Sequence, residues 1–201
     1  MGIRLGDDNL ISITPFPDTK TFKNLKENGY LTINFVDNIY LYCLAALKEK
    51  ESKLGIESFP KELYGYKELD IEKKGSSERY KLLFPYIKSA WGVLIGETFI
   101  EQVKVKKDKL GETKLTEFKI KIFYCEKIKE SYKLFNRAEN LTLECIILAT
   151  RINVAKQKDD RELLKNYLIQ FNSMVETVMR ISDLENIVKA IKLVEEYVNS
   201  L

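Results

Sequence analysis

The sequence contains no histidine, and this absence narrows the chemistry open to the protein. Histidine is the commonest metal ligand in proteins and the commonest general base near neutral pH. Zinc catalysis and hydrolysis by a Ser-His-Asp triad are therefore poorly supported. We expect no metal site, and no residue stands out as a catalytic acid, base or nucleophile.

Cysteine is scarce as well. The three cysteines, Cys43, Cys125 and Cys145, are far apart in the sequence and lie in apolar runs. An odd number of cysteines without a Cys-x-x-Cys pair argues against a disulfide framework or a metal cluster. We therefore expect three reduced, buried thiols.

The chain also lacks long apolar runs and a strong excess of charge. No segment approaches the length needed to cross a bilayer, and residues 1–5 lack the basic start and apolar core of a secretory signal. We expect a cytoplasmic protein with no membrane insertion.

The charges nearly balance, since Lys+Arg 33 against Asp+Glu 30 gives a net charge of only +3. The lysines are interleaved among acids, so no nucleic-acid partner is expected. The richness in Lys, Glu and Ile is typical of thermophiles.

The first two thirds of the chain carry the patterns of β-strands. The expected strands are residues 9–14, 30–36, 91–97, 98–106 and 115–127, with 30–36 as a central strand. Asn28-Gly29 is a stop signal before the second strand, and Gly92 and Gly96 indicate bulges or barrel corners. Residues 39–43 are expected to extend or pair as strand and 44–53 to form a short helix, whereas residues 52–89 show no clear pattern.

Beyond residue 131 the apolar period becomes helical. Three capping-box patterns, Asn136 with Glu139, Asp159 with Glu162 and Ser182 with Glu185, predict helices over about 137–153, 160–181 and 183–200. The first is apolar nearly all round, so it should be packed on several sides. In it Glu144 and Arg151 lie seven residues apart, which fits either a buried ion pair or contact with a ligand. Strands followed by helices predict the α+β class.

One polar segment lies between the first two strands. It reads Thr14-Pro15-Phe16-Pro17-Asp18-Thr19-Lys20-Thr21-Phe22-Lys23-Asn24-Leu25. Thr19, Lys20 and Thr21 offer two hydroxyls and an ammonium at adjacent positions, which suits a phosphate monoester. Alternatively, Asp18 caps a helix that starts at Thr19 or Lys20 and the threonines are merely solvated. The residues alone leave both interpretations open.

Three stretches carry a resemblance to a known family. These are residues 1–5, residues 18–37 with Asp18-Thr19-Lys20-Thr21 and Thr32-Ile33-Asn34-Phe35-Val36-Asp37, and residues 135–152 with Phe135-Asn136-Arg137-Ala138 and Ala149-Thr150-Arg151-Ile152. Together they resemble an uncharacterised, mainly archaeal family with the FMN-binding split β-barrel of flavin reductases and pyridoxamine-phosphate oxidases. The resemblance implies a barrel of residues 1–130 followed by a helical C-terminal domain of about three helices, residues 131–201.

The same resemblance implies a cofactor, FMN, and residues that would bind it. Thr19, Lys20 and Thr21 match the segment that holds the FMN phosphate, Thr14 matches the strand end before it, and Arg4 matches a strand edge facing the flavin. The family has a further strand before the segment that begins here at Met1-Gly2. That strand would complete the barrel and part of the flavin pocket, so its loss would weaken FMN binding.

Several functions are compatible with this resemblance. The most concrete is a flavin-reductase-like oxidoreductase, in which electrons pass from a reduced nicotinamide to FMN. The sequence has no Gly-rich dinucleotide fingerprint to support it. The alternatives are a flavin carrier or sensor, a structural dimer that keeps the fold without catalysis, and an interaction module that has lost flavin. A homodimer is expected because split barrels usually build the flavin site between subunits. Trp91 is expected either beside the flavin or in the core.

Overall fold

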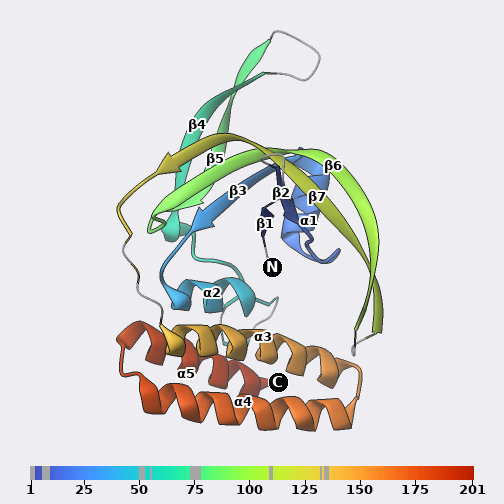
Figure 1. The fold of residues 1–201 in the computed structure, drawn as a ribbon, viewed down its shortest axis with the longest axis vertical. Helices are drawn as coiled ribbons and strands as arrows, with labels where there is room; N and C mark the ends of the chain where they lie inside the picture. Colours follow the sequence, from blue (N-terminus) through green and yellow to red (C-terminus); the bar gives the residue numbers. More distant parts are fainter. Residues whose placement is uncertain are drawn as a thin grey trace. The chain divides into compact units, whose positions relative to one another are not determined.

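The computed structural model describes residues 3–5, 10–49, 53–54, 56–72, 78–108, 111–131, 133 and 136–201 of the chain. It separates into two compact units. The first, here the strand unit, comprises Met1–Val36 and Lys61–Ser131, and the second, the helical unit, comprises Asp37–Pro60 and Tyr132–Leu201. Figure 1 labels the elements of both units. The chain thus enters the helical unit once after the third strand, leaves it, and returns after the last strand.

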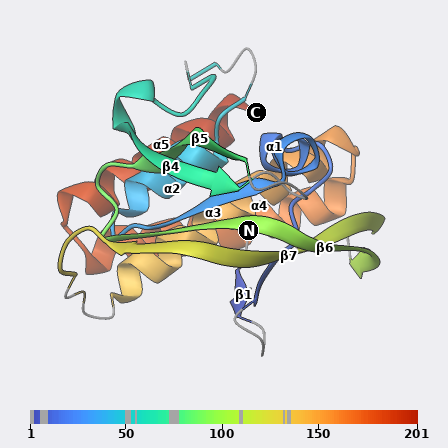
Figure 2. The same ribbon diagram turned by 90° about the horizontal axis from the view of Figure 1, so that it is seen from above.

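The strand unit is built on a five-stranded antiparallel sheet. Its order is β1 (Arg4–Leu5), β2 (Leu10–Ile13), β7 (Gly111–Lys127), β6 (Gly92–Asp108) and β3 (Tyr30–Phe35). Figure 2 shows β3, β6 and β7 running across the view, with the edge strand β1 below β7. The prediction that residues 30–36 form a central strand is wrong in one respect, because β3 is the other edge of this sheet. Its apolar sequence reflects burial against a neighbouring layer and not strand pairing on both sides.

A second, two-stranded sheet occupies the region that gave no clear pattern. A 3₁₀ turn, η1 (Lys61–Leu63), leads into β4 (Tyr64–Glu72), which pairs with β5 (Arg79–Ile87). Ile71 of β4 and Phe84 of β5 pack with Val93 and Ile95 of β6. The hairpin therefore covers one face of the main sheet, with its inner residues alternating with charged ones.

Helix α1 (Lys20–Asn28) lies against the opposite face of the sheet. Its Leu25 is buried with Ile11, Ile13, Ile33, Phe118 and Ile120. The helix ends at Gly29, whose φ of 73° is the left-handed conformation that the Asn-Gly signal predicts. The edge of the Phe22 ring meets Phe118 of β7, with ring centroids 5.8 Å apart.

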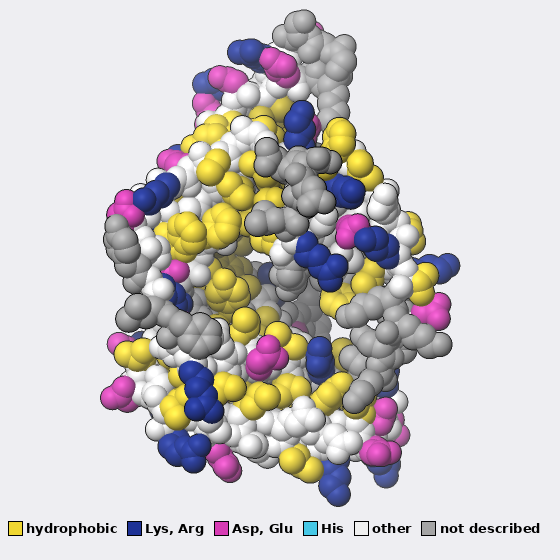
Figure 3. Space-filling view, in the orientation of Figure 1, with side chains coloured by type: hydrophobic (Ala, Val, Ile, Leu, Met, Phe, Trp, Pro, Cys, Tyr) yellow, Lys and Arg dark blue, Asp and Glu magenta, His cyan; other side chains and the backbone are white. Residues whose placement is uncertain are grey.

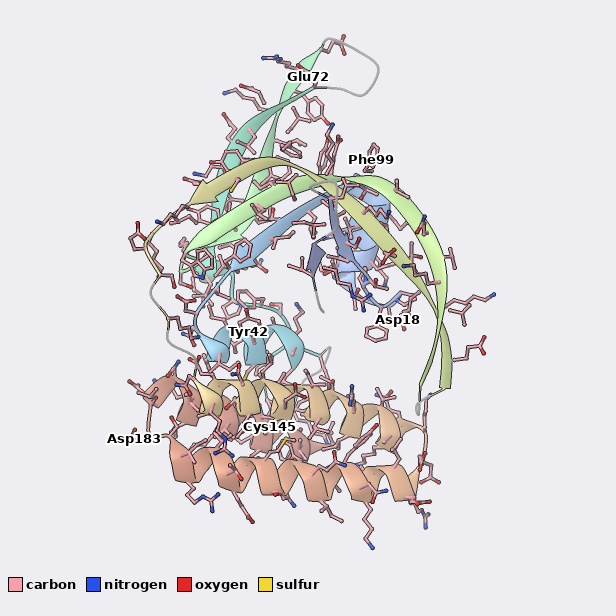
Figure 4. All side chains as sticks on the ribbon, viewed as in Figure 1. Asp18, Tyr42, Glu72, Phe99, Cys145 and Asp183 are labelled. Carbon is pink, nitrogen blue, oxygen red and sulfur yellow. The ribbon has the colours of Figure 1, made fainter. Side chains whose placement is uncertain are left out.

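The longest strands, β6 and β7, contain two register shifts. One lies between Ile95 and Gly96 and the other between Thr98 and Ile100. The first agrees with the predicted bulge at Gly96, where a Cβ atom would come within 2.5 Å of the Ile120 side chain. The second leaves Phe99, labelled in Figure 4, largely exposed.

The helical unit contains α2 (Ile39–Ala46), α3 (Arg137–Gln157), α4 (Arg161–Ile181) and α5 (Glu185–Ser200). The expectation that residues 39–43 are strand is wrong, because Asn38 caps a helix there by accepting a hydrogen bond from the Tyr40 N–H. Beta-branched and aromatic residues favour strands intrinsically. Here burial of Ile39, Leu41, Cys43 and Leu44 against other helices overrides that preference.

The three predicted capping boxes fare differently. Asn136 caps α3 as expected and accepts from the N–H groups of Ala138 and Glu139. The cap of α4 is Asp160 and not Asp159, because Asp159 takes a left-handed φ of 53° in the preceding turn. α5 starts after Leu184, with no side-chain cap.

The helical unit has a continuous apolar core. Its fully buried residues include Cys43, Cys145, Val178, Ile187, Ile191 and Val194. Glu49 on the segment after α2 accepts hydrogen bonds from the Tyr197 hydroxyl and the Asn153 amide, which joins α2, α3 and α5. The predicted buried pair of Glu144 and Arg151 is wrong, because both side chains are exposed. No helix in the described ranges is both long and apolar enough to span a bilayer.

Candidate functional site

The start of α1 combines a capping threonine with two further polar residues. The Thr19 Oγ1 donates a hydrogen bond of 2.7 Å to the Phe16 carbonyl and accepts one of 3.2 Å from the Phe22 N–H. Thr19 is therefore the N-cap, where one interpretation of the sequence had placed Asp18. Since its only hydroxyl proton is already used, Thr19 fixes the helix start and has none left for a ligand.

The two residues that follow keep their donors available. The Lys20 side chain is exposed, and it forms no ion pair with the residues that the structure describes. The N–H groups of Lys20 and Thr21 are in the first turn, where no helical carbonyl can accept them. Asp18, labelled in Figure 4, lies in the turn just before. Two N–H groups, one ammonium and the half-buried Thr21 hydroxyl thus lie at adjacent positions of a helix N-terminus, which is the kind of end that favours an anion.

Arg4 and Thr14 are placed differently from that group. Arg4 pairs with Ser12 across β1 and β2, so both point away from the face that carries Ile11 and Ile13. Those two isoleucines contact α1, and Arg4 therefore lies on the face of the sheet opposite α1. Thr14 follows directly after β2 and is half-buried. The structure thus brings Thr19, Lys20 and Thr21 together and leaves Arg4 apart from them.

Sequence reasoning missed a charged cluster that joins the hairpin to the main sheet. The Lys67 Nζ of β4 lies 2.6 Å from a carboxylate oxygen of Glu126 on β7, and the Tyr124 hydroxyl donates to the same carboxylate at 2.8 Å. The ammonium also lies 6.0 Å from the ring centres of Tyr86 and Tyr124. The hydrogen bond from Lys67 lowers the pKa of Glu126 and raises the pKa of Lys67 itself. The sequence did contain one signal for this cluster. Lys67, Leu69 and Ile71 stand at every second position, which places their side chains on one face of a strand.

Aromatic residues gather at two other places in the strand unit. Trp91, just before β6, is half-buried and its ring centre lies 4.9 Å from that of Phe35. Tyr30, Phe84 and Phe123 form edge-to-face contacts on the face covered by the hairpin. Burial, the Tyr80 hydroxyl and Glu97 together raise the pKa of Tyr30 to about 12, so its hydroxyl stays protonated at neutral pH.

Comparison with known proteins identifies the family. Residues 1–129 match the family described as "Protein of unknown function (DUF447) N-terminal domain". The chain belongs to this family. The crystal structure of an FMN-bound protein from Methanosarcina mazei, assigned to DUF447, has a similar fold, with a TM-score of 0.66 at 16% sequence identity. The match covers 98% of this chain and 85% of that chain. No curated protein is significantly similar to the chain.

These comparisons test two of the predictions made from the sequence, the fold class and the family. The α+β class is confirmed by the antiparallel sheets and helices and by the similar fold. Membership of an uncharacterised family with an archaeal representative is also confirmed. Because the likeness is at 16% identity, it concerns the fold, and the binding residues stay predictions.

Proposed function

We propose that this protein binds FMN, in a strand unit that forms a split β-barrel, with the flavin phosphate at the start of α1. The observation that carries the proposal is the group of unused donors on Lys20 and Thr21, on a fold shared with an FMN-bound protein of the same family. The match of residues 1–129 to the family supports placing the site in the strand unit.

The residues present fit a phosphate monoester. Lys20 would supply the full positive charge, and the Thr21 hydroxyl and the first-turn N–H groups would supply short hydrogen bonds. Thr19 would act indirectly by fixing the first turn through its bonds to Phe16 and Phe22. Arg4 lies on the face of the sheet opposite α1 and so would not hold the phosphate. Arg4 and Thr14 are proposed to contact other parts of FMN.

Bound FMN supplies redox chemistry by accepting and giving electrons. The protein's part would be to anchor the phosphate, orient the ring and exclude water. We propose flavin-reductase-like oxidoreduction as the activity, in a cytoplasmic homodimer. The alternative is a flavin carrier or sensor, or a structural dimer that keeps the split-barrel fold without catalysis.

The test is a titration of the purified, flavin-free protein with FMN and with riboflavin, followed by fluorescence quenching. Tighter binding of FMN is expected, because riboflavin has no phosphate for Lys20 and Thr21 to hold. Equal affinities for FMN and riboflavin would refute the proposed phosphate site, and no binding of either would refute the flavin function.

Adding NADH to the complex then separates the two activities, since bleaching of the flavin absorbance indicates a reductase and an unchanged spectrum indicates a carrier.

A further inference from the structure

The β4–β5 hairpin leaves part of its face of the main sheet uncovered. Along β7, Lys119 and Lys121 alternate with Phe118 and Ile120, which pack against α1, so both lysines lie on the hairpin side of the sheet. Phe99 is the extra residue of the bulge between Thr98 and Ile100, and Figure 4 shows it projecting from the sheet on the same side as the hairpin. The uncovered surface, here the open face, comprises Phe99, Lys119, Lys121 and Phe123, with Tyr80 of β5 at its border.

The aromatic side chains of the open face are exposed but two of them are held in place. Phe99, Phe123 and Tyr80 are 60%, 43% and 40% exposed. The Phe123 ring meets Tyr30 and Phe84 edge-on, with ring centroids 6.3 and 6.0 Å apart. The Tyr80 hydroxyl lies 3.2 Å from that of Tyr30. Rings that are already fixed lose little freedom when a flat ligand stacks on them.

Two unpaired cations stand beside these rings. Neither Lys119 nor Lys121 forms a hydrogen bond or an ion pair with a residue that the structure describes. They stand two residues apart on one strand, and Phe123 follows at the next position of the same spacing. Figure 3 shows hydrophobic and basic side chains next to one another over β6 and β7.

The remaining charges on this side of the sheet leave the open face positive. Arg4, proposed above to contact FMN, lies on the same side. The described acids there beyond the hairpin are Glu97, opposite Lys121, and Glu117, which pairs with Lys104 at 2.6 Å. Arg4 and the two unpaired lysines therefore face one acid that no described lysine neutralises, and the open face favours an anionic ligand.

Exposed rings beside unpaired cations fit a single-stranded nucleic acid. Its phosphates need cations along a track, and its unstacked bases need flat rings. Sheet faces with exposed aromatic residues bind such strands in known modules. A duplex keeps its bases stacked on each other, and an acidic peptide has no flat group for each ring. The expectation of no nucleic-acid partner rested on lysines interleaved with acids, whereas residues 118–123 alternate lysines with apolar residues.

We propose that the open face binds single-stranded RNA or DNA, with bases stacked on Phe99 and Phe123 and phosphates against Lys119 and Lys121. Stacking accepts every base, so little sequence preference is expected. The FMN phosphate is proposed at α1, on the other side of the sheet, so this inference does not rest on the FMN site.

The first experiment measures binding of fluorescein-labelled oligonucleotides to the flavin-free protein by fluorescence anisotropy. The probes are a mixed-sequence RNA of about 12 nucleotides, which is within the site sizes of single OB folds, the DNA of the same sequence and its duplex. The single strands should bind more tightly than the duplex, and the tighter of RNA and DNA identifies the ligand.

The second experiment removes the exposed ring. Phe99→Ala should weaken single-strand binding roughly five- to a hundredfold through the loss of one stacked base, with no change in its salt dependence. Phe99→Tyr keeps a ring there and should bind like the wild type. Tyr66→Ala, which removes an exposed ring from β4, is the matched control and should leave the affinity unchanged.

The third experiment removes the cations. The double variant Lys119→Ala/Lys121→Ala should lower the slope of log affinity against log salt by about 1.4, because two phosphates lose their partners. Lys165→Ala/Lys192→Ala, at exposed positions of the helical unit, is the matched control and should keep the wild-type slope.

Three outcomes would overturn the proposal. The first is no single-strand binding at low salt, or duplex binding that is as tight. The second is unchanged affinity in Phe99→Ala, or equal slopes for the two double variants. The third is displacement of the labelled strand by polyglutamate of the same charge as readily as by unlabelled strand. Lys20→Ala should bind the oligonucleotide like the wild type, so failure of the FMN site is seen separately.

Discussion

The two units differ in how fully their apolar side chains are buried, and their polar groups hydrogen-bonded, by residues of the same unit. In the helical unit the helices bury their apolar faces against one another, and polar groups such as Glu49, Asn153 and Tyr197 bond to each other. In the strand unit two ribbons, the β4–β5 hairpin and the far ends of β6 and β7, keep open edges, and exposed apolar residues such as Val103 and Tyr66 lie on them. Open edges and unused donors are what a partner or ligand requires. This difference supports looking for the proposed FMN site in the strand unit.

The cysteines give the largest expected contrast between the units. Cys43 and Cys145 are buried in the helical unit, and burial raises the pKa of each thiol to about 12. Cys125 on β7 is exposed, which corrects the expectation of three buried thiols. Native protein should therefore lose one thiol rapidly to a disulfide reagent, and the other two roughly a thousandfold more slowly or only on unfolding.

The control for this contrast is Cys125→Ser. This variant should lose the rapid phase of labelling and keep the slow one. Rapid reaction of two or three thiols in the folded protein would show that the helical core is more open than the structure indicates.

A smaller effect is expected from closing the space beside Gly96. A Cβ there would lie 2.5 Å from the Ile120 Cγ2 and 2.7 Å from the Lys121 carbonyl oxygen. Gly96→Ala should lower the free energy of unfolding of the strand unit by about 1–3 kcal/mol, because the strands must move apart. Gly92→Ala is the matched control, since its nearest atoms are 3.5 Å away.

Denaturant unfolding followed by Trp91 fluorescence, which reports on the strand unit, measures both variants. Equal midpoints for Gly96→Ala and Gly92→Ala would mean that the bulge at Gly96 adapts without cost.

The smallest effect concerns the Lys67–Glu126 pair that joins the hairpin to the sheet. Because Lys67 lowers the pKa of Glu126, the stabilisation is present above the pKa of an unfolded glutamate, about 4.3, and is lost as the pH falls through the lower folded value. Both side chains are about a third exposed, so the contribution at neutral pH should be only about 0.5–1 kcal/mol.

The check is the difference in unfolding free energy between the wild type and Glu126→Gln, measured from neutral to acid pH. This difference should shrink toward zero as Glu126 becomes protonated. Glu130→Gln, in an exposed pair with Lys127, should show a smaller difference at every pH. A constant difference for Glu126→Gln would mean that packing, and not charge, holds the hairpin there.

Much of the fold could be predicted where local pattern and burial agree. β2 (Leu10–Ile13), the long β6–β7 pair and the C-terminal helices follow regular apolar periods, and the end of α1 at Gly29 follows from the Asn-Gly signal. The β4–β5 hairpin was missed because its strands alternate charged residues with aromatic ones and contain Gly65 and Pro85, which weaken strand signals. α2 was mistaken for strand because tertiary packing overrides the strand preference of Ile39 to Cys43.

The candidate site was predictable only in part for similar reasons. The sequence showed that Thr19, Lys20 and Thr21 are adjacent, but not that the Thr19 hydroxyl is consumed by the cap. It also could not show that Arg4 falls on the opposite face, because this depends on the pairing register of a two-residue strand.

The measurement that tests the central claim most directly is the affinity of Lys20→Ala for FMN and for riboflavin, with Lys23→Ala as the control on the same helix. The Lys20 ammonium should contribute about 1.5–3 kcal/mol to a bound phosphate. FMN binding should therefore weaken roughly ten- to a hundredfold, while riboflavin binding to Lys20→Ala and FMN binding to Lys23→Ala stay near the wild-type values. Unchanged FMN affinity in Lys20→Ala, or an equal loss for FMN and riboflavin, would contradict a phosphate site at the start of α1.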